Sequence, residues 1–288
     1  MKYKIAVLFS NFFLFLISNI FRIPFIGEII SRNTSTRSMK VRSFNYSNSF
    51  KFKSLKALVV NEKTFWRFKN LEKKEPETHD FLSSINDDDL LWDIGANIGQ
   101  MTLSAAKQSK CKIISFEPDP ANFFILQNNI FINNLGNRVM ALCMPLSDNN
   151  SIVSLPFDQD SIGFCNVGRS NLSIFDNSKE TQIHNSILAS SITGDSFLAL
   201  YPELLPTHLK IDVDGIELDI LFGLKNLLKS NRLKSIIIEA IHSGDDANYN
   251  EIIDFLSSFG FTAKAISPNI VSGLVVATTT KFLVPSIG

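Results

Sequence analysis

A sharp turn between an apolar run and a helix-like segment is the first place in this sequence whose residues suit chemistry. The stretch LLWDIGANIGQ (90–100) ends its apolar run on Asp93. Gly95 and Gly99 follow, with Asn97 between them. Open α/β sheets hold nucleotide-like cofactors where a strand turns into a helix through glycines. The pattern therefore predicts a cofactor site after this strand.

The spacing of the turn indicates which kind of cofactor it suits. In G-x-G-x-x-G dinucleotide sites, the middle glycine lets the backbone approach a pyrophosphate. Here the turn reads G-x-x-x-G with Asn97 inside it, which favours a cofactor without phosphate. S-adenosylmethionine fits, because it carries an adenosine, a sulfonium and a charged amino-acid tail. We expect Asp93 to order the turn and to face the ammonium of that tail. Gly95 and Gly99 are expected to let the turn pack against the cofactor and the sheet.

An acidic residue at the end of the next strand adds to this prediction. The run CKIISFEP (111–118) contains Glu117 near its end, 24 positions after Asp93. An acid at this place commonly accepts hydrogen bonds from two ribose hydroxyls. Glu75 and Thr78, which precede the first strand of the site, either border the cofactor or cap a helix. The predicted cofactor-binding residues are Asp93, Gly95, Asn97, Gly99 and Glu117.

Three stretches resemble the signature blocks of the FkbM family of S-adenosylmethionine-dependent methyltransferases: LLWDIGANIGQMTLSAA, ISFEPDPANFFILQNNIFINN and HLKIDVDGIELDILFGL. The resemblance covers about residues 75–245. It implies a class I methyltransferase sheet and O-methylation of sugars or polyketides. Two positions depart from the commonest family pattern. Asp214 stands where glutamate is usual, and Gly194 stands where leucine is usual before Asp195, so the role of Asp195 does not follow from the resemblance.

Charged residues alternate along the third of these blocks, in HLKIDVDG (208–215). Lys210, Asp212 and Asp214 share one face of the predicted strand, while their apolar neighbours point the other way. Charges in a buried strand are costly unless they are paired or lie at its rim. We expect Lys210 to pair with Asp212 at the carboxyl end of the strand, where ligands of open α/β sheets bind. A purely structural ion pair that supports the next turn is the alternative.

Two further candidates lie at the end of the next apolar run, KSIIIEAI (234–241). Methyl transfer to a hydroxyl requires removal of a proton, and histidine titrates near neutrality, so His242 is the candidate base. A histidine in a loop is, however, commonly a surface residue. Alternatively, Asp212 and Glu239 bind a divalent cation that acidifies the hydroxyl. The predicted catalytic residues are Lys210, Asp212, Glu239 and His242, and no metal site is assigned.

Strands and helices alternate over most of the chain. The expected strands are 55–60, 90–95, 111–118, 138–146, 208–213, 234–241, 261–267 and 274–280, and the expected helices are 77–85, 98–109, 119–136, 216–230 and 247–260. This order predicts an α/β, Rossmann-like fold: a mostly parallel sheet with helices on both faces and a terminal antiparallel hairpin. The methyltransferase domain is expected to span residues 55–288, with an inserted segment of short strands and loops over 147–195.

The overall composition indicates an ordered globular protein. Hydrophobic residues make up 45% of the chain and charged residues 19%, with a formal net charge of zero. The balanced charge gives no sign of nucleic-acid binding, so no nucleic-acid partner is expected. The 3 cysteines match no zinc or redox spacing and are expected to be free thiols in a reducing compartment.

The beginning of the chain is a separate apolar segment. Residues 5–21 are mostly apolar, and on a helix Lys4, Asn11, Ser18 and Arg22 fall on one narrow stripe. The pattern predicts an amphipathic helix over residues 1–30 that lies in a membrane interface. A single spanning anchor and a helix packed on the protein's own surface are the alternatives.

A basic linker rich in serine and asparagine is expected over residues 31–54. Basic segments beside a membrane-seeking helix are attracted to anionic lipid on the cytoplasmic side. We therefore expect a cytoplasmic protein at the inner face of a membrane, attached peripherally or by a single anchor.

Taken with the family resemblance, these features predict an S-adenosylmethionine-dependent methyltransferase that methylates a hydroxyl on a saccharide or glycan precursor. An NAD(P)-dependent oxidoreductase is one alternative, which the missing G-x-G-x-x-G pattern disfavours. A non-catalytic, membrane-tethered binding protein is the other, which the acids at Asp93, Glu117 and Asp212 disfavour.

Overall fold

The computed structural model of the chain describes residues 39–47, 50–156, 170–171, 186–213, 215–241, 247–266 and 272–279. The helix predicted over residues 1–30 and the candidate base His242 lie outside these described residues, as does Asp214. Within the described part of the chain, no helix has the length and apolar character needed to cross a membrane.

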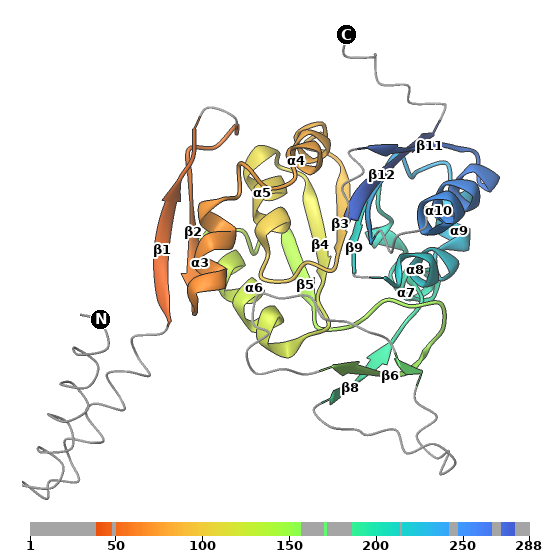
Figure 1. The fold of residues 1–288 in the computed structure, drawn as a ribbon, viewed down its shortest axis with the longest axis horizontal. Helices are drawn as coiled ribbons and strands as arrows, with labels where there is room; N and C mark the ends of the chain where they lie inside the picture. The colour runs from red at the N-terminus through yellow and green to blue at the C-terminus, as the bar shows by residue number, and fades with distance from the viewer. Residues whose placement is uncertain are drawn as a thin grey trace, which may run out of the picture.

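In the described residues, seven strands form a central sheet in the order β11-β12-β10-β9-β3-β4-β5 (Figure 1). The strands are β3 (Leu90–Ile94), β4 (Lys112–Phe116), β5 (Val139–Leu142), β9 (His208–Asp212), β10 (Ser235–Ile241), β11 (Phe261–Ile266) and β12 (Ser272–Thr279). From β5 to β10 neighbouring strands run parallel, while β12 runs antiparallel to both β10 and β11. The predicted sheet, mostly parallel with a terminal antiparallel hairpin, is confirmed.

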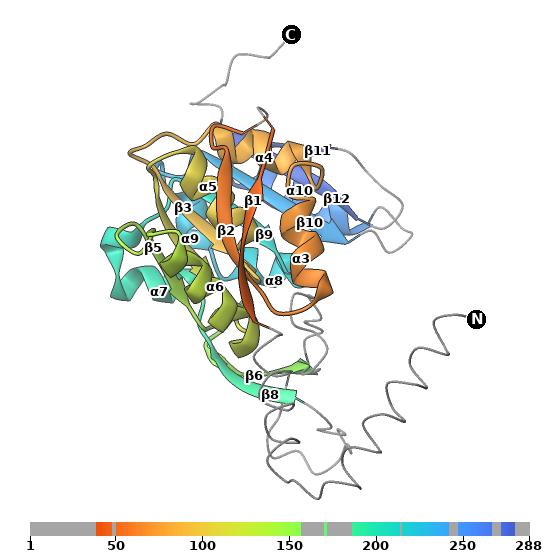
Figure 2. The ribbon, with the colours of Figure 1, turned by 90° about the vertical axis from the view of Figure 1, so that its left-hand side faces the viewer.

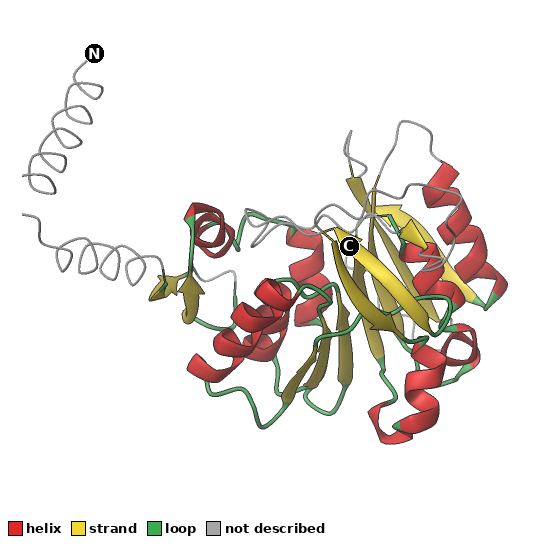
Figure 3. Cartoon of the chain, turned by 90° about the horizontal axis from the view of Figure 1, so that it is seen from below, coloured by secondary structure: helices red, strands yellow, loops and turns green. Residues whose placement is uncertain are grey.

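Helices cover both faces of this sheet (Figure 3). One face packs against α4 (Pro76–Ser83), α5 (Gln100–Gln108) and α6 (Pro120–Ile132), and the other against α7 (Gly194–Leu200), α8 (Glu217–Phe222), α9 (Lys225–Lys229) and α10 (Ala247–Ser258), with the 3₁₀ helix η2 (Pro202–Leu204) after α7. Successive side chains of a strand point to opposite faces. Leu91 and Ile113 accordingly join the first core, and Trp92 and Ile114 join the second. This double burial explains why the strands read as continuous apolar runs.

Local hydrogen bonds fix where two of the helices begin. Asp119 accepts the backbone N–H of Ala121 at 2.8 Å and of Asn122 at 2.9 Å, which starts α6 as its sequence predicts. The helix α3 (Glu62–Lys69) was not expected from the sequence. It begins at Asn61, whose side chain and backbone exchange hydrogen bonds with Thr64.

A β-hairpin occupies part of the expected linker. Strand β1 (Lys40–Asn45) pairs antiparallel with β2 (Ser54–Val59), so residues 40–45 are a strand and not a linker. This segment is ordered against the protein because it buries three aromatic side chains, Phe44, Phe50 and Phe52. Only 5 to 8% of the surface of each remains exposed.

The second edge of β2 is held by side chains of α6. Leu58 donates its backbone N–H to Asn129 Oδ1 at 2.7 Å, and Lys56 donates to Asn133 Oδ1 at 3.1 Å. In Figure 2 the hairpin lies between α3 and α6, and both helices pack on β2. These contacts attach the hairpin to the main body of the protein.

The segment inserted before β9 contains the short strands expected there. Strands β6 (Ser151–Pro156), β7 (Ser170–Asn171) and β8 (Ser186–Ser191) form a small antiparallel sheet. This sheet lies at the bottom of Figure 1, outside the central sheet.

Candidate active site

Charged side chains gather where β3, β9 and β10 end, which is where ligands of open α/β sheets bind. A cavity of about 200 Å³ opens there. Its walls come from the turn after β3, the first residues of α5 and the ends of β9 and β10. The structure places five residues predicted from the sequence in this lining: Gly95, Asn97, Lys210, Asp212 and Glu239.

The turn after β3 needs glycine at two points of close contact. Gly95 has φ +79°, and a Cβ on it would lie 1.9 Å from the backbone oxygen of Asp212. Gly99 has φ +90°, and a Cβ on it would lie 2.6 Å from Leu126 Cδ1 on α6. Asn97, at φ +50°, also adopts the left-handed region, which asparagine tolerates better than most residues. The turn therefore rests on β9 and on α6, which is the packing role expected for these glycines.

Glu117 ties this turn to the loop after β4. It accepts the backbone N–H of Asn97 at 2.6 Å and of Asp119 at 2.9 Å. Burial raises the pKa of Glu117 to about 8, although both hydrogen bonds act to lower it. Glu117 does not line the cavity. Each of its oxygens keeps a second lone pair, so both remain able to accept a ligand hydroxyl.

Lys210 is a buried cation between two carboxylates. Its Nζ lies 3.2 Å from Asp93 Oδ1 and 3.2 Å from Asp212 Oδ2, so the expected pair with Asp212 is present. Burial alone would lower the pKa of Lys210, but the two carboxylates raise it above its ordinary value, and Lys210 stays protonated. Asp93 is fully buried and also accepts a hydrogen bond from Thr102 on α5. Asp93 thus lies beneath the turn, and its expected contact with a cofactor ammonium stays a prediction.

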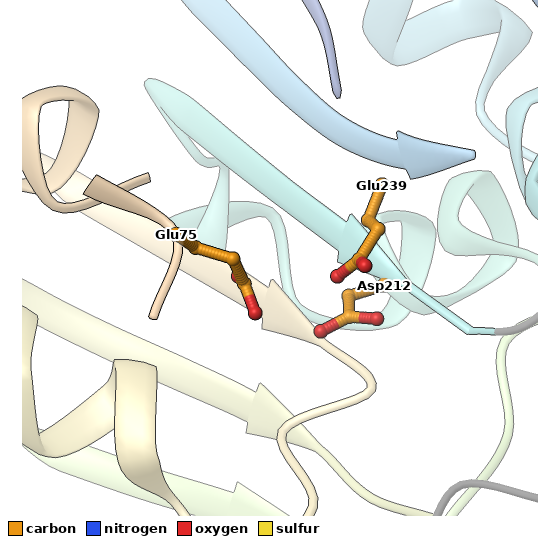
Figure 4. A group of neighbouring side chains, drawn as sticks. All are labelled: Glu75, Asp212 and Glu239. Carbon is orange, nitrogen blue, oxygen red and sulfur yellow. The ribbon is translucent and has the colours of Figure 1, made fainter. Parts of the chain in front are cut away.

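Three carboxylates face one another at the end of β9 (Figure 4). One oxygen from each of Glu75, Asp212 and Glu239 lies within 4.8 Å of the other two. Glu75 stands at the start of α4 with φ +53°, and its side chain makes no helix-capping hydrogen bond. A non-glycine residue in the left-handed region costs on the order of 1–3 kcal/mol and often marks a functional position. Glu75 therefore caps no helix through its side chain, and its expected place beside the cofactor stays a prediction.

The pKa values of Glu239 and Asp212 are shifted in opposite directions. Burial raises the pKa of Glu239 to about 7, and the charges of Asp212 and Glu75 raise it as well. Burial would also raise the pKa of Asp212, but the Lys210 ammonium lowers it below the ordinary value. Neighbouring groups whose pKa values are pushed apart suit acid–base chemistry. Glu239 is therefore a candidate base within the described residues, whereas the candidate His242 lies outside them.

The same oxygens also suit a divalent cation, the alternative that the sequence left open. Magnesium and calcium bind carboxylate oxygens, and Glu75 adds a third to those of Asp212 and Glu239. Lys210 and Lys74, however, already pair with Asp212 and Glu75. Removal of the hydroxyl proton by a carboxylate and activation of the hydroxyl by a divalent cation would therefore use the same residues.

Two cations of the cavity lining were not candidates from the sequence. Arg67 Nη1 donates to Gln100 Oε1 at 3.1 Å, and Gln100 Nε2 donates to the backbone oxygen of Arg67 at 2.6 Å. Lys74 forms an ion pair with Glu75. These residues reach the site because α3 packs beside β2 and ends near the start of α4. The capping motif at Asn61 was the available sequence signal for this helix.

Asp195, whose role the family resemblance left undecided, is a helix cap. Its carboxylate accepts the backbone N–H of Asn226 at 2.8 Å and of Leu227 at 3.0 Å, at the start of α9. A Cβ on the preceding Gly194 would lie 2.1 Å from Leu224 Cδ2, so glycine permits this close packing. Both positions serve the packing of α7 on α9.

Comparison with known proteins gives consistent matches. The family model for the methyltransferase FkbM domain matches residues 93–263. The hexuronic acid methyltransferase AglP of Haloferax volcanii is 28% identical over 188 residues, which cover 65% of this chain and 70% of that protein. Methyltransferase 1 of Beauveria bassiana is 26% identical over 199 residues, which cover 64% and 76%. Among solved structures, the precorrin-6y C5,15-methyltransferase of Geobacter metallireducens GS-15 has a TM-score of 0.44 at 13% identity, over 71% of this chain and 87% of that one.

Proposed function

The chain belongs to the FkbM family of methyltransferases, and from this premise we propose that it transfers a methyl group from S-adenosylmethionine to a hydroxyl of a saccharide or glycan precursor. The observation that carries the proposal is the cavity where the glycine turn meets the Lys210–Asp212 pair and Glu239. Family membership also favours this activity over the NAD(P)-dependent oxidoreductase.

The residues at the end of β3 and β4 fit S-adenosylmethionine. This cofactor supplies a methyl group on a sulfonium sulfur. Gly95 has no room for a side chain against β9, and the turn lacks the pyrophosphate-binding glycine spacing. Glu117 offers two acceptor oxygens at the place where adenosine cofactors present their ribose hydroxyls.

Calorimetry on Glu117 variants tests the cofactor. Glu117→Ala removes both oxygens, and each net hydrogen bond is worth roughly 0.5–1.5 kcal/mol, so affinity for S-adenosylmethionine should fall about tenfold. Glu117→Gln keeps the shape and one acceptor oxygen, so it can retain only one of the two backbone hydrogen bonds, from Asn97 or from Asp119, and should weaken binding less than Glu117→Ala. Cofactor affinity that is unchanged in both variants would overturn the ribose assignment.

The chemistry proposed for the site divides between its charged residues. The hydroxyl oxygen of the acceptor forms the new bond to the methyl carbon while the carbon–sulfur bond breaks in line. Glu239, with a pKa of about 7, accepts the hydroxyl proton. Lys210 and Asp212 hold the fixed charges that orient the acceptor. General-base assistance is worth about 10²–10⁴-fold, and placement on the order of 7–11 kcal/mol.

One relative and the inserted segment support a saccharide as the acceptor. One relative is named for methylation of a hexuronic acid, which carries several hydroxyls and a carboxyl group. The short strands β6 to β8 stand before β9 in the chain and form a serine-rich sheet. We propose that this segment contacts the sugar acceptor.

The decisive assay follows labelled methyl from S-adenosylmethionine into a panel of neutral and acidic glycans. A product that is stable to alkali supports an ether on a hydroxyl. A base-labile product would mean a methyl ester on a carboxyl group, and label on amines would mean N-methylation. Either result rejects the hydroxyl acceptor while leaving methyl transfer in place.

We also propose that the enzyme works at the cytoplasmic face of a membrane, beside lipid-linked glycans. The support is the apolar, amphipathic pattern of residues 1–30 and the basic residues that follow. Deletion of residues 1–30 should move the protein into the soluble fraction and leave cofactor binding intact. A full-length protein that is soluble without detergent and does not bind anionic liposomes would contradict this.

A further inference from the structure

The segment between α3 and α4 brings two charged residues to the site from a part of the chain that precedes the family match. Lys74 lines the cavity, and Glu75 points toward Glu239 and the end of β9 (Figure 4). Both lie before the residues that the family model matches. We infer that His79 is a positioning residue for methyl transfer, because it holds this segment, residues 70–75, against the site. The inference rests on the proposed function.

His79 fixes the segment at two points. Its backbone N–H donates to the backbone oxygen of Glu75 at 3.2 Å, and its ring Nε2 donates to the backbone oxygen of Leu71 at 2.8 Å. Burial lowers the pKa of His79, so the ring is neutral and carries its single hydrogen on Nε2. The other ring nitrogen, Nδ1, then accepts the hydroxyl of Ser104 at 3.1 Å. Both nitrogens are therefore satisfied, and the ring is held in one orientation.

The tip of the β1–β2 hairpin also contacts this segment. Ser47 donates its backbone N–H and its hydroxyl to Glu72 Oε1, at 2.6 and 2.7 Å. Phe50 packs edge-on against the His79 ring, with the ring centroids 4.7 Å apart. The hairpin therefore supports the segment directly through Glu72 and indirectly through His79.

The backbone conformation at Glu75 explains why such support is needed. Its φ of +53° lies in the left-handed region. A non-glycine residue keeps such a conformation only where the surrounding structure holds it there. Glu75 lies between Leu71 and His79 in the chain, and the His79 ring bonds directly to Leu71. Loss of that bond should let the segment relax, which would displace Lys74 and Glu75 from the carboxylates of the site.

This displacement would change the charges that act on Glu239. Burial is the largest cause of its raised pKa, followed by the charges of Asp212 and Glu75, while the ammonium groups of Lys74 and Lys210 act in the opposite direction. Because Glu75 acts more strongly than Lys74, displacement of both should lower the pKa of Glu239 from about 7. A loss of stability alone would not produce such a shift.

A titration of Glu239 tests the inference in the full-length protein without any acceptor. Carbon-13 NMR of the glutamate carboxyl groups follows this residue, with Glu239→Gln for assignment. In His79→Leu, which cannot donate to Leu71, the midpoint should fall by about half a pH unit or more. His79→Gln has a side-chain N–H that can replace the donor and should restore the midpoint. Ser104→Ala, the matched control, removes only the hydrogen bond at Nδ1 and should leave the midpoint unchanged.

Turnover and cofactor binding should respond differently to these changes. With the glycan that the wild-type protein methylates fastest, His79→Leu should lower kcat/KM by about fivefold or more, while affinity for S-adenosylmethionine stays within about twofold. Glu72→Ala removes the contact with the hairpin at a partly exposed position. It should shift the Glu239 midpoint in the same direction by less, and it provides the test if His79→Leu does not fold.

The outcomes separate this inference from the function on which it rests. An unchanged Glu239 midpoint in both His79→Leu and Glu72→Ala would overturn the inference. An equal shift in Ser104→Ala would assign His79 a purely structural role and also overturn it. A shift caused by His79→Leu that persists in a Glu75→Gln background would show that His79 does not act through Glu75, with the same result. Shifted midpoints in a protein without methyl transfer would support the hold on the segment and overturn the proposed function instead.

Discussion

Strand β9 has an ionic cluster at each end, and the two clusters use similar residues differently. At its start, His208 contacts Asp89 at 3.2 Å and Ser235 at 2.7 Å, and Lys234 contacts Asp89 at 2.6 Å. Burial alone would raise the pKa of Asp89, but Lys234 and His208 bring it down to about 2. One carboxylate and one ammonium thus balance, and burial keeps the pKa of His208 below its ordinary value.

The cluster at the other end of β9 is unbalanced. Four carboxylates (Glu75, Asp93, Asp212 and Glu239) lie near three cations (Arg67, Lys74 and Lys210), and Asp212, Glu239 and all three cations line a cavity. The surplus of negative charge is what raises the pKa of Glu239 toward neutrality, after burial. We therefore expect the amino-end cluster to stabilise the fold and the carboxyl-end cluster to bind a charged ligand.

This difference warns against assigning function by residue type. The amino-end cluster has the three residue types of a hydrolase triad, because His208 contacts both Asp89 and Ser235. They lie, however, at the amino ends of parallel strands and are buried. Ligands of open α/β sheets bind at the opposite edge. Position at the sheet edge and charge balance are therefore the reasons for choosing the carboxyl-end cluster as the candidate site.

Removal of charge from the unbalanced end should have the largest effect. Asp212→Asn keeps the shape and leaves Lys210 with Asp93 alone, so turnover should fall by about 10²-fold or more while cofactor affinity changes little. Labelled-methyl transfer and calorimetry measure the two quantities. Asp254→Asn, an exposed acid on α10, is the control. Turnover within a few-fold of wild type would remove Asp212 from the chemistry.

The same change at the balanced end should affect stability instead. Asp89→Asn removes the carboxylate charge that Lys234 and His208 contact, so the free energy of unfolding should fall by about 2 kcal/mol, with turnover unchanged. Because the pKa of Asp89 is lowered to about 2, its contribution is present above its ordinary pKa and disappears as pH falls toward 2. Urea unfolding of the variant and of Asp88→Asn, an exposed neighbour, at neutral and acid pH gives the comparison. A drop in turnover at full stability would contradict the division between the two ends.

The pH dependence of the reaction tests the same difference between the two ends of β9, with a smaller expected effect than either substitution. If Glu239 accepts the proton, kcat/KM should fall tenfold per pH unit below about 7 and level off above it. The contribution of Glu239 to the free energy of unfolding changes with pH in the opposite direction to kcat/KM. A carboxyl whose pKa is raised by folding stabilises the protein below its ordinary pKa, and that contribution is lost as pH rises through 7. Glu239→Gln should flatten both profiles. A profile that keeps its slope in this variant would point to another base.

The sequence predicted the sheet well, because buried strands and their ends leave clear patterns. Asp93 and Asp212 were placed correctly, at or next to a strand end, from apolar runs that stop at an acid, whereas β10 continues two residues beyond Glu239 to Ile241. The pairing of Lys210 with Asp212 followed from the cost of burying charge. Each of these predictions depends on local sequence.

What the sequence could not supply depends on packing between distant segments. Arg67 and Lys74 reach the cavity only because α3 packs on β2, and α3 has a short, weakly apolar sequence. Asp195 serves α9, 31 and 32 residues later in the chain, and nothing in its neighbourhood indicates this. The hairpin strand over residues 40–45 has one buried aromatic among charged residues, too weak a pattern to predict a strand.

The amides of Asn129 and Asn133, which hold the edge of β2, also join parts of the protein that the chain order keeps apart. They belong to the helix whose Leu126 supports Gly99. Hairpin, helix and glycine turn should thus detach as one cooperative unit in local unfolding. The backbone amides of Lys56 and Leu58 would then exchange with solvent deuterium only when α6 lifts away. A ligand that holds the glycine turn in place should therefore slow hydrogen exchange at these amides of the hairpin, although the ligand does not contact the hairpin.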